Sequence, residues 1–129
     1  MTCEQAINYL YSRLKFGSVP GLERIAALCE LLGNPQDKLK FVHVAGTNGK
    51  GSVCTMMSRM LINAGYKTGL YTSPYVMDFR ERMQINGEMI PEDELGALMD
   101  EIKPKVEELD KKGITPTEFE VLTSLAFLY

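Results

Sequence analysis

Hydrophobic side chains recur at three- and four-residue intervals in five segments of the chain, as they do along helices with one buried face. The predicted helices cover residues 3–14, 22–32, 53–64, 91–112 and 117–129. The spacing of Thr2 with Gln5 and of Thr117 with Glu120 predicts capping boxes for the first and last helices, and a glycine follows each of the other three. Pro104 interrupts the fourth helix, where we expect a kink or a break.

Short apolar segments predict two strands, at residues 41–45 and 68–72, on either side of the third helix. A strand, a helix and a strand in this order form a βαβ unit, whose strands are parallel and whose ligand edge lies at their carboxyl ends. A hairpin is predicted at residues 83–90, because Asn86 and Gly87 suit a type I′ turn. We therefore expect an α/β fold built on a parallel sheet.

Two features indicate that the domain is incomplete. Sheets usually have about four or more strands, whereas two parallel strands leave apolar faces and open edges. The last helix is still apolar at Tyr129 and shows no stop signal. We interpret the chain as the N-terminal part of a larger protein, with a small self-sufficient α/β domain as the alternative.

Composition narrows the classes of function. The chain has 129 residues, of which 45% are hydrophobic and 24% charged, within the ordinary globular range. Its net charge of -3 has the wrong sign for a protein that coats nucleic acid or an anionic membrane. No apolar segment approaches the roughly 18 residues of a membrane span, and no signal peptide is recognisable. We predict a cytoplasmic protein with neither nucleic acid nor membrane as a partner.

Several residues with potential chemistry have a structural explanation. Cys3, Cys29 and Cys54 are odd in number and widely spaced, so we expect core side chains and neither a disulfide framework nor a zinc site. His43 lies inside a predicted strand, where a packed residue is expected. A cluster of methionines at helical spacing is expected to fill the core: Met56, Met57 and Met60.

A glycine-rich loop joins the first predicted strand to the third helix, with the sequence Gly46-Thr47-Asn48-Gly49-Lys50-Gly51-Ser52. Phosphate-binding loops need this context, because their backbone N–H groups converge on phosphate oxygens at a helix N-terminus. Lys50 would neutralise charge on the β- and γ-phosphates, and Ser52 would add a hydroxyl donor. The match to the general P-loop pattern is imperfect, since Val44 replaces its first glycine and Gly51 separates the lysine from the hydroxyl residue. The alternative is a glycine-rich turn with a solvated lysine.

Four motifs run in order along nearly the whole chain: His43 to Ser52, Gly69-Leu70-Tyr71-Thr72-Ser73-Pro74, Glu81-Arg82 and Thr117-Glu118-Phe119-Glu120. Together they resemble the folylpolyglutamate synthases and the bifunctional dihydrofolate synthases of bacteria, in the Mur ligase superfamily. The resemblance implies a P-loop-type ATPase domain with a parallel sheet, followed by a smaller domain. Residues 1–129 would then be the N-terminal part of the ATP-binding domain, with the C-terminal domain absent.

The implied activity is ATP-dependent amide formation between a pterin-linked carboxylate and L-glutamate. A carboxylate is a poor acceptor for an amine, so it would first take the γ-phosphoryl group of ATP and form an acyl phosphate. Lys50 would be the catalytic residue, and Ser73, which follows the second strand, would be a ligand of Mg²⁺. Without the resemblance, Ser73 and Pro74 would be a turn. The ATP-binding residues would be Thr47, Asn48, Gly49, Lys50, Gly51 and Ser52.

Candidate substrate contacts fall in three segments. Pro20 to Leu22 and Thr117 to Glu120 resemble pteroate-contacting segments of the family, although a helix cap also explains Thr117 and Glu120. Tyr75 and Phe79 could stack on a flat pterin, with Arg82 near an anionic tail. The candidates are Pro20, Gly21, Leu22, Tyr75, Arg82, Thr117, Glu118, Phe119 and Glu120. Dihydropteroate, folates or both remain open as substrates, and another Mur-type ligase or a stand-alone nucleotide-binding module are the alternative functions.

Overall fold

The structure is a computed structural model that describes residues 1–17, 19–45, 49–73 and 77–129. They form two compact units, one of residues 1–39 and 92–129 and the other of residues 40–91. Among the described residues of the first unit, the α-helices are α1 (Cys3–Ser12), α2 (Glu23–Leu31), α4 (Glu92–Lys111) and α5 (Glu118–Leu128). Two short 3-10 helices, η1 (Arg13–Phe16) and η2 (Pro35–Lys38), follow α1 and α2.

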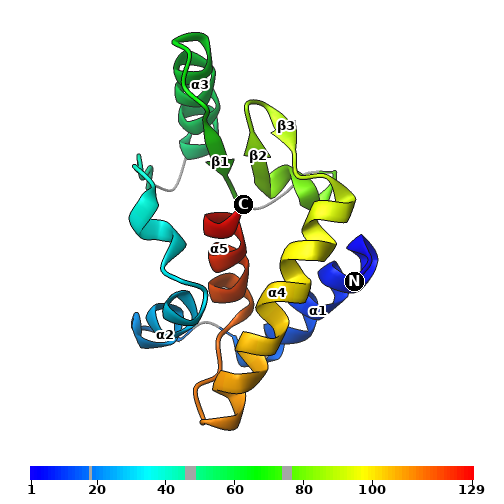
Figure 1. The fold of residues 1–129 in the computed structure, drawn as a ribbon. Helices are drawn as coiled ribbons and strands as arrows, with labels where there is room; N and C mark the ends of the chain where they lie inside the picture. The colour runs from blue at the N-terminus through cyan, green and yellow to red at the C-terminus, as the bar shows by residue number, and fades with distance from the viewer. Residues whose placement is uncertain (18, 46–48, 74–76) are drawn as a thin grey trace. The chain divides into compact units, whose positions relative to one another are not determined.

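Helix α5 is central to the first unit, where it contacts α1, α2 and α4 (Figure 1). Apolar and polar side chains of α5 are buried together, which is typical of a helix covered on several sides. Helix α4 presents a single buried stripe toward its neighbours, at three- and four-residue spacing. The core residues of this unit include Ala6, Leu10, Leu28, Leu95, Met99, Ile102, Val106, Leu109, Val121, Leu122 and Leu125.

Local signals fix the ends of these helices as predicted. Both capping boxes are present, at Thr2 with Gln5 and at Thr117 with Glu120. After α4, Gly113 has a φ of 79°, and the N–H of Ile114 donates to the carbonyl of Leu109. This arrangement is a Schellman motif, which satisfies carbonyls that the helix end would leave open.

Of the kink or break predicted at Pro104, the break is wrong, because α4 runs without interruption from Glu92 to Lys111. Pro104 and Asp100 both lie on the exposed side of the helix. The carbonyl of Asp100, which loses its N–H partner to the proline, is therefore on the side where water can replace that donor. Buried Ile102 and Val106 hold the helix on either side of the proline.

The second unit contains α3 (Lys50–Asn63), η3 (Phe79–Arg82) and the strands β1 (Gly69–Tyr71), β2 (Met83–Ile85) and β3 (Glu88–Met89). The strands form an antiparallel sheet in the order β1-β2-β3, with Leu70 opposite Gln84. The predicted hairpin and its type I′ turn are confirmed, since Asn86 and Gly87 have φ values of 52° and 84°.

The parallel pairing predicted for residues 41–45 and 68–72 is not found in the part of the chain that the structure describes. Strand β1 pairs with β2 in the antiparallel direction, and residues 41–45 have no regular secondary structure. A parallel strand needs cover on both faces, whereas Phe41 and Val42 are 58% and 64% exposed. His43 is exposed as well, so its predicted packing is also wrong.

The prediction that methionines of α3 fill a core is likewise wrong, because Met56 and Met60 are 59% and 70% exposed. Helix α3 contacts β1, but fourteen helical residues extend over about 21 Å and three strand residues over only about 10 Å. The strand is therefore too short to cover the helix. Of the cysteines expected in the core, only Cys29 is buried, and Cys3 and Cys54 are half-buried.

Candidate functional site

The first candidate site is the N-terminus of α3. Gly49 is the residue before the helix and has a φ of 77°, a left-handed conformation that favours glycine. Lys50 is the first helical residue, and it is exposed together with Gly51 and Ser52. Among the residues that the structure describes, no side chain caps this end, and its first turn carries no acidic residue. Because the first N–H groups of a helix have no partner within the helix, this end combines open donors with positive potential.

The structure thus bears on Gly49, Lys50, Gly51 and Ser52 among the predicted ATP-binding residues. Thr47 and Asn48 lie outside the described residues, as does the candidate substrate contact Tyr75. The helix that the loop motif requires is present, whereas the strand before the loop is not. The described residues therefore provide an anion with a helix N-terminus and a lysine on the first turn of that helix.

Ser73, the predicted magnesium ligand, lies in the same unit, two residues beyond β1. Its hydroxyl is exposed and accepts a hydrogen bond from Nη2 of Arg82 at 3.1 Å. The backbone joins the same segments, because the N–H of Thr72 donates to the carbonyl of Arg82 at 3.0 Å. The hydroxyl is therefore fixed by a buried cation while it stays accessible.

Arg82, which was predicted to lie near an anionic tail of the substrate, is largely shielded from water. Only 7% of it is exposed, and its guanidinium lies 5.4 Å from the centre of the Phe79 ring. Phe79 is itself 4% exposed. The guanidinium of Arg82 therefore donates a hydrogen bond to Ser73, the predicted metal ligand, and lies over the ring of Phe79.

Asp78 starts the 3-10 helix between these residues, with a capping box to Glu81 that the sequence analysis overlooked. The Asp-x-x-Glu spacing was the available signal. Hydrogen bonds from the side chain and the backbone of Arg80 hold the pKa of the Asp78 carboxyl below its usual value. Arg80 and Asp78 also form an ion pair at 3.0 Å. The segment that carries Arg82 is thus anchored by its own charges.

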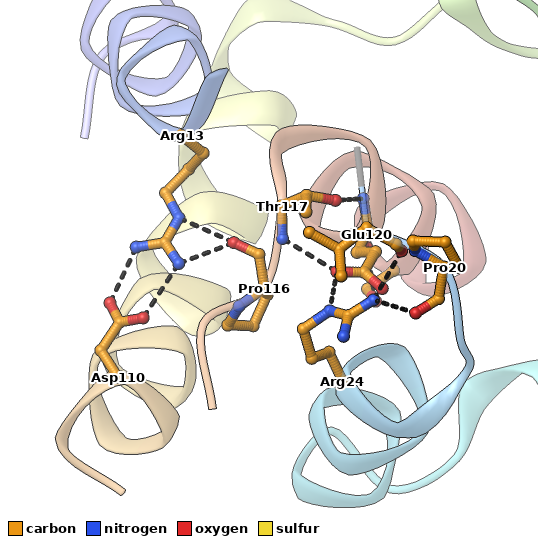
Figure 2. Close-up of polar contacts among 9 residues, drawn as sticks. Arg13, Pro20, Arg24, Asp110, Pro116, Thr117 and Glu120 are labelled. Carbon is orange, nitrogen blue, oxygen red and sulfur yellow. Dashed lines mark hydrogen bonds and ion pairs between the residues drawn. The ribbon is translucent and has the colours of Figure 1, made fainter. Parts of the chain in front are cut away.

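The second group of predicted residues lies in the first unit, around Arg24 (Figure 2). Its Nη2 donates to the carbonyls of Val19 at 2.7 Å and Pro20 at 3.3 Å. Its Nε donates to Oε1 of Glu120 at 3.0 Å, and that oxygen also accepts from the N–H of Thr117 at 2.9 Å. The segment at Pro20 is thereby brought to the start of α5.

Sequence reasoning missed Arg24. A weak signal was available, because Glu120 was predicted to be a capping residue and a capping carboxylate that is buried needs a cation. Glu120 is 8% exposed, and so is Glu118. By contrast Leu22 and Phe119 are 77% and 55% exposed, so apolar surface flanks the buried ion pair on both segments.

A second arginine fixes the loop that leads into α5 (Figure 2). Nη1 and Nη2 of Arg13 donate to the two carboxylate oxygens of Asp110, at 2.7 and 2.9 Å. Nη2 and Nε of Arg13 also donate to the carbonyl of Pro116, at 2.7 and 3.1 Å. Because Pro116 precedes the cap residue Thr117, this arrangement holds the N-terminus of α5 from the other side.

A shallow hollow of about 280 Å³ lies beside Arg24. Its lining residues are Phe16, Val19, Glu23, Arg24, Gly113, Ile114 and Thr115. Among the described residues there is no group of three or more His, Cys, Asp or Glu side chains that could hold a metal ion. The search of those residues also finds no helix that is both long and apolar enough to cross a membrane.

The chain is similar to folate-modifying ligases along its whole length, although it matches no protein-family model. It is 47% identical over 127 residues to the dihydrofolate synthase/folylpolyglutamate synthase of Bacillus subtilis, across 98% of this chain and 30% of that protein. The crystal structure of the folylpolyglutamate synthase of Thermotoga maritima superimposes with a TM-score of 0.90 and 43% identity, across 98% of this chain and 30% of that one.

A second solved relative is a complex of folylpolyglutamate synthase with AMPPCP and folate. It has a TM-score of 0.87 and 36% identity, and the match covers 100% of this chain and 32% of that one. The chain is a homologue of the folylpolyglutamate synthases and dihydrofolate synthases, and it spans about 30% of the length of these relatives.

Proposed function

We propose that the chain carries the phosphate-binding part of an ATP-dependent ligase that joins L-glutamate in amide linkage to folate, dihydropteroate or both. The observation that carries this proposal is the exposed N-terminus of α3, with Gly49 before the helix, Lys50 on its first turn and no acidic residue there. A homologue solved with AMPPCP, an ATP analogue, and with folate supports both ligand classes.

In this function the first N–H groups of α3 bind phosphate oxygens of ATP, and the ammonium of Lys50 neutralises charge on the β- and γ-phosphates. The substrate carboxylate attacks the γ-phosphorus, ADP leaves, and an acyl phosphate results. The amine of glutamate then attacks the acyl carbon and displaces inorganic phosphate, which leaves the amide. The protein contributes alignment and charge stabilisation, which supply most of the catalysis in phosphoryl transfer.

Ser73 suits a magnesium ion that is bound mainly by phosphates and water. Mg²⁺ commonly keeps several waters and takes few ligands from the protein, so a single accessible hydroxyl fits it better than a closed metal cage would. The hydrogen bond from Arg82 occupies one lone pair of Ser73 Oγ and leaves the other for the ion. When bound, Mg²⁺ would neutralise phosphate charge.

We further propose that residues 41–45 join a parallel sheet in a protein as long as the relatives. Phe41 and Val42 are exposed, as are Val53, Met56 and Met60 at helical spacing on α3. We infer from so many exposed apolar side chains within one small unit that a partner is missing. The isolated chain should therefore self-associate, which light scattering measures. A monodisperse monomer with one cooperative melting transition would contradict this proposal.

Titration calorimetry with ATP and Mg²⁺ tests the phosphate site on this chain. We expect weak binding that Lys50→Ala abolishes, and unchanged binding in the control variant Lys67→Ala, which removes another exposed lysine of the same unit. Micromolar or tighter affinity that is indifferent to Lys50→Ala would refute the assignment of this site.

Incorporation of labelled glutamate tests the reaction, in a protein of the relatives' full length that contains this chain. We expect ATP-dependent amide formation with dihydropteroate or a folate. Amide formation with a different carboxylate would identify another Mur-type ligase, and nucleotide binding without any ligation would identify a nucleotide-binding module. Either result would overturn the proposed substrate.

A further inference from the structure

Arg24 connects the loop just before α2 to the start of α5, which lies 96 residues further along the sequence. From the first turn of α2 it reaches back to the carbonyls of Val19 and Pro20, and across to Glu120 in the first turn of α5 (Figure 2). The side chains of Arg24 and Glu120 are 16% and 10% exposed. Hydrogen bonds of a cation that is largely shielded from water are stronger than those of a surface ion pair.

We propose that Arg24 is a positioning residue for the pteroate-binding surface, which it forms by holding residues 19–22 against the N-terminus of α5. This inference rests on the proposed function, because the ligand class comes from there. The loop and the start of α5 supply candidate substrate contacts, and Arg24 is the described side chain that binds both.

The loop needs such an anchor because its sequence does not stiffen it. Gly21 lies at a φ of 113°, a conformation that costs a glycine considerable backbone entropy to hold. A side chain at Gly21 would be strained, because L residues rarely adopt this φ, and the carboxylate of Glu23 would have to move away from the added Cβ. Two carbonyls bound to one rigid guanidinium restrict the loop at Val19 and Pro20, directly before this glycine.

Loss of Arg24 should release the loop more than it disturbs α5. Oε1 of Glu120 keeps its second donor, the N–H of Thr117, and the Thr117 hydroxyl still accepts from the N–H of Glu120 at 3.3 Å. The capping box therefore survives. The carbonyls of Val19 and Pro20, by contrast, lose the guanidinium that binds them, and both residues are exposed to water.

The surface that Arg24 organises has the character of a site for a flat, largely apolar group. Leu22 and Phe119 are exposed on the two segments that the ion pair joins. Aromatic and aliphatic side chains around a few fixed polar groups are typical of small-molecule sites. A surface built from two segments binds a flat ligand well only when those segments keep their spacing, which is the property that Arg24 controls.

Steady-state kinetics of Arg24→Ala tests the proposal, in a protein of the relatives' full length that contains this chain. We expect the KM for the pterin substrate to rise at least tenfold while the KM for ATP changes less than twofold. The pterin KM of Arg24→Lys should lie between those of the wild type and Arg24→Ala, because an ammonium keeps the charge but lacks the forked N–H groups of a guanidinium. Met99→Ala, a buried substitution in α4 of the same unit, is the control that lowers the melting temperature without moving either KM.

Amide hydrogen exchange supplies a readout that does not depend on activity. In Arg24→Ala the backbone N–H groups of Val19, Gly21 and Leu22 should exchange at least tenfold faster, while the N–H of Val121, inside α5, keeps its protection. An unchanged pterin KM, or equal rises in both KM values, would overturn the proposal and reduce the ion pair to a structural contact. A wild-type protein without glutamate ligation would instead overturn the proposed function, and with it the ligand named here.

Discussion

Arg13→Ala should be the most destabilising single change at the polar contacts of the first unit. The guanidinium makes four hydrogen bonds, two to the carboxylate of Asp110 and two to the carbonyl of Pro116. Its side chain is only 6% exposed, and it lies 4.5 Å from the centre of the Phe16 ring. The substitution removes all of these contacts and leaves a carboxylate without its cation.

The free energy of unfolding that Arg13→Ala loses depends on how well water can replace the arginine beside Asp110. Breaking a fully buried ion pair from one side costs about 3–5 kcal/mol, because the remaining charge is not solvated. The side chain of Asp110 is 28% exposed, so water recovers part of that free energy. We therefore expect a loss of about 2–3 kcal/mol, which corresponds to a fall in melting temperature of about 8–12 °C for a chain of this size.

Thermal and urea denaturation followed by circular dichroism measure this loss on the chain. Lys112→Ala is the matched control, since Lys112 and Glu108 form a pair at 3.9 Å whose side chains are 61% and 47% exposed. Such a surface pair contributes at most about 0.5 kcal/mol. A double-mutant cycle with Asp110→Ala isolates the coupling between Arg13 and its carboxylate. If Arg13→Ala costs no more than Lys112→Ala, the argument from burial is refuted.

Three further predictions concern other sites. Burial raises the pKa of the Cys29 thiol, which also lies 3.6 Å from the hydroxyl of Ser124, so a thiol reagent at pH 8 should modify half-buried Cys3 and Cys54 well before it; equal rates would contradict this. Gly96→Ala should lower the melting temperature although alanine favours a helix by about 1 kcal/mol, because the added methyl would overlap the backbone carbonyl of Met1; a rise would show that this contact yields easily. Arg80 holds the pKa of the Asp78 carboxyl below its unfolded value. The contribution of Asp78 to stability should therefore be present above about pH 4 and be lost as the pH falls through the folded pKa. An NMR titration of this carboxyl with a midpoint at or above that of an unfolded peptide would contradict the prediction.

The features predicted correctly from the sequence were those that depend on residues three to six positions apart. The capping boxes at Thr2 and Thr117 and the turn at Asn86 and Gly87 are confirmed, because each depends on backbone groups only a few residues away. The Asp78 box was missed although its spacing is the same. It starts a 3-10 helix of four residues, which has no room for the apolar periodicity that drew attention to the other two.

Short-range sequence patterns could not predict the partners of Arg13 and Arg24. Arg13 meets Pro116, and Arg24 meets Glu120, across about a hundred residues of sequence. Nothing near either arginine indicates its partner, because the contact exists only once α1, α2 and α5 have packed together. At the candidate substrate surface the sequence therefore indicated the segments that meet, through resemblance, but not the side chain that joins them.

Helices α3 and α5 show why periodicity predicts a face but not its burial. Val53, Met56 and Met60 repeat at helical spacing, yet all three are exposed, whereas Val121, Leu122 and Leu125 are fully buried. The difference lies in the neighbours: α5 contacts three helices of its own unit, while α3 contacts a strand of three residues. An apolar stripe indicates that a partner is needed and gives no information on where in the sequence that partner lies. We infer that in a protein as long as the relatives, residues outside the aligned region cover α3, which agrees with the proposal that residues 41–45 join a parallel sheet there.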